Sequence, residues 1–248
     1  MNRKYSFIFA FLITGLIACN VYLFSSFSHQ SSRETALVAR VIDGDTLVLD
    51  DGRTIRLLNI NTPEKSEPNS NLGTEFLKSL ENESIQLETT GIDKYGRTLA
   101  RLYNSSDYFN LKLVSLGYAV KFLVSESELN EFSSAEENAI ENSLGIWHKS
   151  EYYGCFKANI DEKKEIAFLI NSCSDINMLG WKIRDESRKY YIFGNVVLGK
   201  INFHSSNGED NETDIFWNQK TDVWNNDRDT LYLLDPEGSI AFYHPYGY

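Results

Sequence analysis

The chain has 248 residues, which is long for one small domain and sufficient for two domains of about 100 residues each. Hydrophobic residues make up 42% of the sequence and charged residues 24%, which excludes a disordered tail. The net charge is −11; residues 34–150 carry 11 basic and 19 acidic residues, and residues 151–248 carry 10 and 16. This balance excludes coating of nucleic acid through general basicity, so any phosphate binding must depend on a few local arginines and a metal ion.

Residues 1–33 have the pattern of a signal or membrane anchor followed by a polar linker. Arg3 and Lys4 form a basic start, and residues 5–27 follow without a charge. This apolar segment is long enough to cross a bilayer as a helix. Three interpretations stay open: an uncleaved anchor, a lipoprotein lipidated at Cys19 within a lipobox-like run, and a cleaved secretory peptide. All three place the rest of the chain outside the cytoplasm.

Residues 34–148 combine strand and helix patterns. Strands are predicted at Thr35–Val41, Thr46–Leu49, Thr54–Ile60, Ser84–Thr89 and Thr98–Tyr103. Apolar residues at helical spacing predict helices near 72–81, 107–117 and 126–143. Elements of these types in this order predict an α+β domain built on a five-stranded OB-type barrel with packed helices.

Side chains that can carry chemistry lie in the turns between these strands. The segments are Asp43-Gly44-Asp45, Arg56 with Asn61-Thr62-Pro63-Glu64, Asp93-Lys94-Tyr95-Gly96-Arg97 and Gly145-Ile146-Trp147. Each acid or arginine alone would be an ordinary turn or surface residue. In this order and with these gaps, the segments resemble the staphylococcal nuclease family over the whole of residues 34–148.

The resemblance implies a calcium-dependent nuclease that hydrolyses the phosphodiester bonds of DNA, with RNA as a second candidate substrate and a 3′-phosphate on the product. Asp45, Asn61 and the Thr62 carbonyl are expected to hold the metal, since hard oxygen donors suit calcium. The family pattern has an aspartate where this chain has Asn61, which removes one formal charge from the site. Weaker calcium binding, with a Kd on the order of 10⁻⁴–10⁻³ M, is therefore expected.

The resemblance also assigns catalytic roles. Glu64 resembles the general base that orients the attacking water, and Arg56 and Arg97 resemble the two arginines that hold the scissile phosphate, a task that suits planar guanidinium groups. A second departure follows Gly117, where the family's paired tyrosines are missing. Stacking on a base is therefore expected from Phe122 or Tyr95.

A non-catalytic binding module at the cell surface is the alternative function. Barrels of this kind also occur in forms that only bind nucleic acid or protein partners. The retained acidic and arginine positions favour the enzyme, whereas Asn61 and the acidic surface favour the binding module.

Residues 155–248 predict an all-β sandwich. Short β-type runs separated by turn signals occur at Glu165–Ile170, Lys182–Arg184, Lys189–Phe193, Ile201–His204, Thr230–Leu234 and Ser239–Tyr243. Residues 179–185, 191–193 and 223–230 resemble the lamin-tail domain, an immunoglobulin-like fold. The resemblance implies an interaction or targeting module with an unidentified protein or surface ligand. Trp181 is expected in its core, and the acidic loop Asn207–Asp214 is expected to be a solvated turn.

Cysteine and histidine spacing excludes several other chemistries. Cys155 and Cys173 have no metal-ligand spacing, and two outcomes stay open: a disulfide, which persists outside the cytoplasm, or two separate buried thiols. The four histidines are scattered without zinc-type spacing, so a metalloprotease is unsupported.

Overall fold

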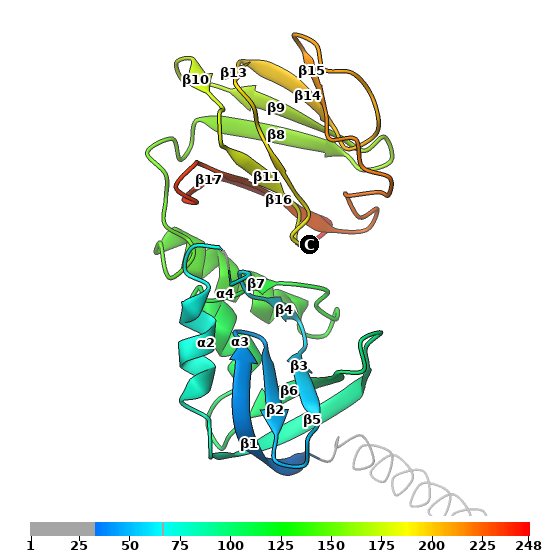
Figure 1. The fold of residues 1–248 in the computed structure, drawn as a ribbon. Helices are drawn as coiled ribbons and strands as arrows, with labels where there is room; N and C mark the ends of the chain where they lie inside the picture. Colours follow the sequence, from blue (N-terminus) through cyan, green and yellow to red (C-terminus); the bar gives the residue numbers. More distant parts are fainter. Residues whose placement is uncertain (1–32, 66) are drawn as a thin grey trace, which may run out of the picture.

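The computed structural model describes residues 33–65 and 67–248. A β-barrel forms one end of the molecule and a β-sandwich the other, with helices beside the barrel and between the two (Figure 1). The predicted N-terminal anchor, with Cys19, lies outside the described residues. Within the described ranges, no helix is both long enough and apolar enough to cross a bilayer.

The first unit is a closed barrel with the strand order β1-β2-β3-β6-β5. Its strands are β1 (Glu34–Asp43), β2 (Thr46–Leu49), β3 (Thr54–Leu57), β5 (Ser84–Ile92) and β6 (Thr98–Tyr103). β3 and β6 pair in parallel and close the barrel, and the other neighbours are antiparallel. Val38, Leu47, Ile55 and Leu102 fill the interior and are fully buried. The predicted five-stranded OB-type barrel is confirmed.

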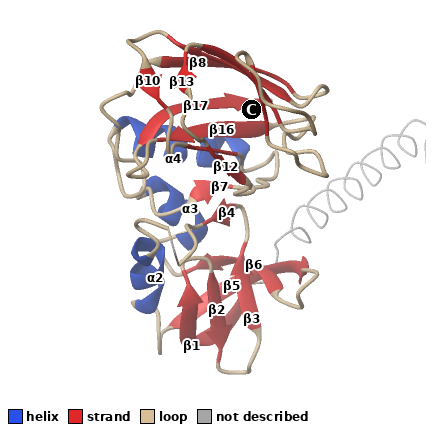
Figure 2. Ribbon diagram, turned by 45° about the horizontal axis from the view of Figure 1, so that its top comes forward, coloured by secondary structure: helices blue, strands red, loops and turns tan. Residues whose placement is uncertain are grey.

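Three helices lie on one side of the barrel and between the barrel and the sandwich (Figure 2). They are α2 (Asn71–Lys78), α3 (Phe109–Ser115) and α4 (Leu129–Glu141). Each falls at a position that the apolar spacing predicts, with ends that differ by a few residues. The apolar residues recur at helical spacing because one face of each helix packs on the barrel. The buried side chains of Leu77 and Phe132, for example, belong to the same apolar cluster as the barrel interior.

The predicted strand Thr54–Ile60 is interrupted in the structure. After β3, a short strand β4 (Ile60–Asn61) leaves the barrel and pairs with β7 (Val120–Lys121). The interruption falls at Asn59, whose φ of 67° is a left-handed conformation that asparagine tolerates better than most residues. The prediction of one continuous strand was wrong because the apolar run conceals this turn.

The second unit consists of two four-stranded sheets and a two-stranded sheet. The larger sheets have the orders β15-β14-β9-β8 and β12-β11-β16-β17, and the third is β10-β13. The strands are β8 (Phe156–Asp161), β9 (Ile166–Asn171), β10 (Ile176–Asn177), β11 (Lys182–Arg184), β12 (Tyr190–Ile192), β13 (Val197–Leu198), β14 (Lys200–His204), β15 (Asp214–Phe216), β16 (Asp229–Leu234) and β17 (Ile240–Tyr246). Trp181, Phe203 and Trp224 are buried in its apolar cluster. The predicted β-sandwich is confirmed, and its lamin-tail resemblance stays a prediction.

The two cysteines of this unit are paired. Cys155 precedes β8, Cys173 lies between β9 and β10, and their sulfur atoms form a disulfide. This settles the choice between a disulfide and two separate thiols.

The barrel and the sandwich are joined by an apolar cluster beside a buried polar one. Trp147 packs on Tyr232 with ring centroids 5.5 Å apart. Lys121, in β7, is 3% exposed, and its Nζ lies 2.7 Å from Glu136 Oε2 in α4 and 3.5 Å from Glu186 Oε1 in the sandwich. A buried ammonium group needs such partners. These contacts hold β7, and through it β4, against the second unit.

Candidate active site

The turn between β1 and β2 brings Asp45 to the segment that follows β4. Asp45 is 5% exposed, and its Oδ2 accepts hydrogen bonds from the Thr62 backbone N–H at 3.0 Å and from Thr62 Oγ1 at 3.1 Å. A Cβ atom at Gly44 would lie 2.8 Å from the Thr62 side chain, so the absence of a side chain there permits the approach. Two of the predicted metal ligands are therefore in direct contact.

Arg56 joins the third predicted ligand to these two. This β3 residue is 8% exposed; its Nε lies 3.3 Å from Asp45 Oδ1, and its Nη2 donates to Asn61 Oδ1 and to the Ile60 carbonyl. Burial lowers the pKa of the Arg56 guanidinium, and the Asp45 carboxylate opposes that shift. Asp45, Arg56, Asn61 and Thr62 thus form one hydrogen-bonded group, which we call the metal-side cluster.

The metal-side cluster contains oxygen donors of the kind that a hard cation accepts. Asp43 supports the turn, since its Oδ1 accepts the Asp45 N–H at 3.1 Å, and burial followed by the Asp45 charge raises the pKa of Asp43. Across the described part of the chain, no three His, Cys, Asp or Glu side chains gather as a metal-binding group. A cation here would therefore depend on one carboxylate, one amide oxygen and one backbone carbonyl, which are oxygen donors of the kind that calcium accepts.

Arg97 lies in the turn between β5 and β6 and is held by Asp93. Asp93 Oδ1 accepts the Arg97 backbone N–H at 2.9 Å, and Asp93 Oδ2 accepts from Arg97 Nε at 2.7 Å. Arg97 is close enough to Arg56 that its charge contributes to the lowered pKa of Arg56. Tyr95 is 71% exposed beside Arg97, whereas Phe122 is half-buried. Of the two residues predicted to stack on a base, Tyr95 has the freer ring.

Glu64 stands apart from the metal-side cluster. Its side chain is 64% exposed, and among the described residues its ion pair is with Arg188 of the second unit, at 2.9 Å between Oε1 and Nη2. Arg188 Nη1 also donates a hydrogen bond to the Thr62 carbonyl. The predicted general base and a predicted metal ligand are therefore joined by an arginine from the sandwich.

The sequence prediction missed Arg188 and its neighbour Glu186. Both lie in the turn between β11 and β12, where the Glu186 backbone carbonyl accepts a hydrogen bond from Asn61 Nδ2 at 3.2 Å. Charged residues in a surface turn are usually solvated, so their type and spacing gave no signal of a site. Contact between positions so distant in the chain is visible only once both units have folded.

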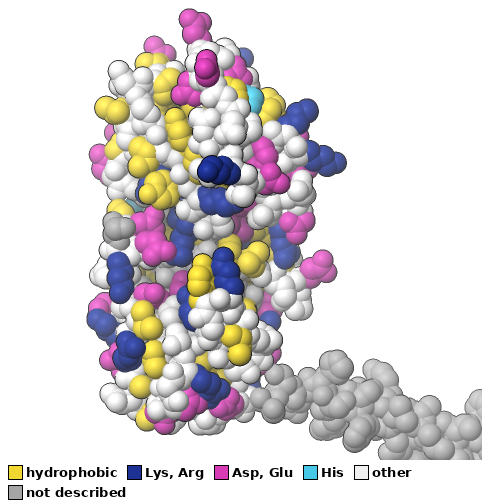
Figure 3. Space-filling view, turned by 45° about the vertical axis from the view of Figure 1, so that its right-hand side comes forward, with side chains coloured by type: hydrophobic (Ala, Val, Ile, Leu, Met, Phe, Trp, Pro, Cys, Tyr) yellow, Lys and Arg dark blue, Asp and Glu magenta, His cyan; other side chains and the backbone are white. Residues whose placement is uncertain are grey.

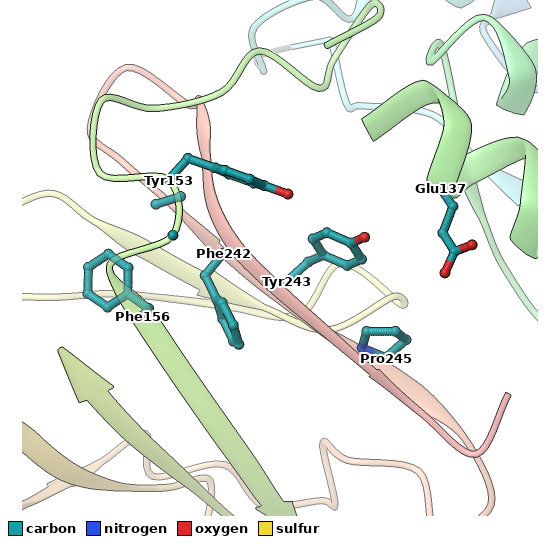
Figure 4. Close-up of a pocket in the computed structure, with 8 residues that line it drawn as sticks. Glu137, Tyr153, Phe156, Phe242, Tyr243 and Pro245 are labelled. Atoms are coloured by element: carbon teal, nitrogen blue, oxygen red, sulfur yellow. The ribbon is translucent and has the colours of Figure 1, made fainter. Parts of the chain in front are cut away.

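Other surface features lie away from these contacts. On the face drawn in Figure 3, acidic and basic side chains are intermixed and no continuous basic area covers it. An aromatic pocket of about 360 Å³ lies where α4 faces β17, with Tyr153, Phe242 and Tyr243 at its wall (Figure 4), and none of the predicted site residues lines it.

The barrel and its site define a nuclease-type OB fold, and comparison with known proteins agrees. Residues 54–149 match the family described as staphylococcal nuclease homologue. The thermonuclease of Staphylococcus intermedius is 36% identical over 130 residues, which cover 47% of this chain and 77% of that protein. The thermonuclease of Staphylococcus hyicus is 34% identical (47% and 78%), and an uncharacterised endonuclease of Haemophilus influenzae is 32% identical (59% and 80%). The chain belongs to the staphylococcal nuclease family.

Proposed function

We propose that this chain is a calcium-dependent nuclease that hydrolyses the phosphodiester bonds of DNA, with RNA as a second candidate substrate. The observation that carries the proposal is the metal-side cluster, in which residues from the turn between β1 and β2, from β3 and β4, and from the segment after β4 share one buried set of hydrogen bonds. Relatives named thermonuclease and endonuclease support the same chemistry.

The metal would be held by the Asp45 carboxylate, the Asn61 amide oxygen and the Thr62 carbonyl. When bound, calcium would supply positive charge to the phosphate and to the attacking water. Glu64 would accept a proton from that water while the new oxygen–phosphorus bond forms and the bond to the leaving oxygen breaks.

Arg56 and Arg97 would stabilise the charge that develops on the non-bridging oxygens. Arg56 approaches from the buried side and is oriented by Asp45 and Asn61. Arg97 approaches from a surface turn, and its described hydrogen bonds to Asp93 use its backbone N–H and Nε. The phosphate would thus be bound between a fixed guanidinium and a more exposed one.

The test is cleavage of supercoiled plasmid and of a single-stranded RNA by the full-length chain in detergent, with millimolar calcium or with a chelator. Wild type should cut only with calcium, and Glu64→Gln should lose cleavage. Glu83→Gln, at an exposed position on the same unit, is the matched control and should cut as wild type does. If wild-type protein cuts neither substrate at any millimolar calcium concentration, the proposed nuclease activity is refuted.

A non-catalytic binding module is the second candidate function. It is favoured by the pairing of Glu64 with Arg188 and by the asparagine at position 61. Fluorescence anisotropy with labelled oligonucleotides separates the two functions, since a binding module would retain the oligonucleotide uncut in calcium and bind it equally with Glu64→Gln.

We further propose that the chain is anchored in a membrane with both units outside the cytoplasm. The uncharged segment 5–27 and the disulfide between Cys155 and Cys173 support this, because disulfides persist in oxidising compartments. Cell fractionation tests it, and the intact mass of the mature chain separates the alternatives: a lipoprotein begins at an acylated Cys19, an uncleaved anchor keeps residues 1–18, and a cleaved secretory peptide leaves an unacylated chain in the soluble fraction. In this arrangement the sandwich, with its lamin-tail resemblance, would be the unit that binds a surface or protein ligand.

A further inference from the structure

The turn between β11 and β12, residues 185–189, lies against the metal side of the candidate active site; we call it the docking turn. The first contact joins Glu186 of the docking turn to Asn61 of the site. Asn61 Nδ2 donates to the Glu186 carbonyl while Asn61 Oδ1 accepts from Arg56. An amide can do both at once, whereas an aspartate has no donor for the Glu186 carbonyl. The asparagine that stands at position 61 in place of the family's aspartate therefore makes a hydrogen bond to the second unit that an aspartate could not make.

The second contact places a cationic group at the oxygens that calcium would use. The Arg188 guanidinium donates to the Thr62 carbonyl and forms an ion pair with Glu64. Calcium would bind the same Thr62 carbonyl and approach the same Glu64 carboxylate, and a guanidinium and a divalent cation held at the same oxygen atoms repel each other. Simultaneous occupancy by Arg188 and calcium is thus disfavoured by charge.

The docking turn is held in place by the sandwich. Asp185 Oδ1 accepts the Lys189 N–H at 2.7 Å, and the Glu186 N–H donates to Asp229 Oδ1 at 3.2 Å. The Glu186 carboxylate accepts from Thr230 Oγ1 at 2.6 Å. The turn therefore presents Arg188 to the barrel as part of a connected hydrogen-bond network.

Formal charge supports competition between Arg188 and the metal. The acids Asp43, Asp45, Glu64 and Asp93 and the arginines Arg56 and Arg97 together leave two negative charges for a cation. Adding Arg188 leaves one. Ligand charge is one of the properties that sets calcium affinity, so two features lower it here: the neutral amide of Asn61 in the first unit and the guanidinium of Arg188 from the second.

We propose that Arg188 is a further residue of the nuclease site, supplied by the second unit, and that it and calcium bind the Thr62 carbonyl and Glu64 in mutually exclusive ways. The inference rests on the proposed calcium-dependent function. Calcium must displace Arg188 to enter, so the position of the sandwich sets the calcium concentration at which the site is filled.

The test is calcium titration of the full-length chain in detergent by isothermal calorimetry, which needs no substrate. Arg188→Ala should tighten calcium binding by about tenfold or more, because it removes a competing charge from the ligand atoms. Arg188→Lys keeps the charge and should stay close to wild type. Arg228→Ala is the matched control, because Arg228 Nη2 bonds the Val124 carbonyl across the same interface without touching the cluster, and it should change affinity by less than about twofold.

Modification by an arginine-specific dicarbonyl reagent gives a second readout in the unaltered protein. Calcium should increase modification of Arg188 in wild type, since its guanidinium leaves the Thr62 carbonyl and Glu64 when the cation enters. Circular dichroism spectra and melting curves of each variant verify that the chain is folded.

Each outcome decides a separate question. If wild type binds calcium and Arg188→Ala binds it no more tightly, competition by Arg188 is refuted while the calcium site stands. An equal gain from Arg228→Ala also refutes it, since loosening of the interface would then be the cause. If wild type and Arg188→Ala both fail to bind at millimolar calcium, the proposed calcium function is refuted together with this inference.

Discussion

The two sides of the candidate active site differ in how the protein holds them. Residues of the metal-side cluster are at most 8% exposed and are bonded to one another, so the folded protein fixes their positions. Glu64 and Arg97 lie in surface turns, with side chains 64% and 31% exposed. The difference predicts that substitutions on the buried side change both stability and the proposed activity, whereas those on the exposed side change the activity alone.

Arg56→Ala should have the largest effect, because it lowers both the stability of the fold and the proposed nuclease activity. It leaves the buried Asp45 carboxylate without its guanidinium partner, and loss of one member of a buried ion pair costs about 3–5 kcal/mol of unfolding free energy. Cleavage should also be lost. Urea denaturation measures the stability. Arg53→Ala, which removes an ion pair of two partly exposed side chains with Glu34, should cost less than about 1 kcal/mol.

Glu64→Gln should remove activity and leave the fold intact. A general base contributes about 10²–10⁴-fold to the rate, so kcat should fall by that factor. The exposed carboxylate makes little contribution to stability, and the unfolding free energy should stay within about 0.5 kcal/mol of wild type. Single-turnover cleavage and urea denaturation measure the two quantities. A stability loss as large as that of Arg56→Ala would abolish the distinction between the two sides.

Glu128→Gln tests whether the turn at Asn59, just before Asn61, belongs to the buried side of the site. Burial opposes ionisation of Glu128, but hydrogen bonds from Arg101, Tyr108 and Asn59 outweigh it and lower the pKa of Glu128 to about 2. A carboxyl group with a depressed folded-state pKa stabilises the protein above its unfolded-state pKa, and the contribution is lost as pH falls through the folded-state value.

The substitution should therefore cost about 2–3 kcal/mol at neutral pH and progressively less as the pH falls from about 4.5 to about 2. Urea denaturation of wild type and Glu128→Gln at several pH values measures the difference. A cost that does not depend on pH would show that the shape of the side chain matters and its charge does not.

Arg97→Lys should have the smallest effect, confined to activity. Lysine keeps the charge and the contact with Asp93 but loses the planar fork, so kcat/KM should fall roughly tenfold with little change in stability. Steady-state cleavage of a short oligonucleotide measures it. If Arg97→Lys unfolds as readily as Arg56→Ala, the surface turn is as essential to the fold as the buried cluster.

The sequence predicted the barrel from local patterns, and the family resemblance placed Asp45 and Thr62 in one expected metal site. Alternating apolar residues define the strands, and the Asp-Gly-Asp and Thr-Pro turns lie at spacings typical of one family. The turn at Asn59 was not predicted. Apolar residues on both sides of it are typical of a strand, and a single asparagine is weak evidence for a turn.

The contribution of the second unit could not be read from the sequence. Arg188 and Glu186 reach the site through the packing of Trp147 on Tyr232 and the buried Lys121, contacts between residues far apart in the chain. The pairing of Cys155 with Cys173 was open for the same reason, because spacing alone does not determine which groups meet.

Lys121 offers a chemical reporter of the distance between the two units. Its amine is enclosed by Glu136, Glu186 and the ring of Tyr248, which lies 4.1 Å from Nζ. Acylating reagents need an accessible, unprotonated amine, and this one has neither property while the sandwich is seated. Mass spectrometry of acetylated peptides would thus record separation of the barrel from the sandwich as modification of a single lysine, without a fluorophore or an engineered cysteine.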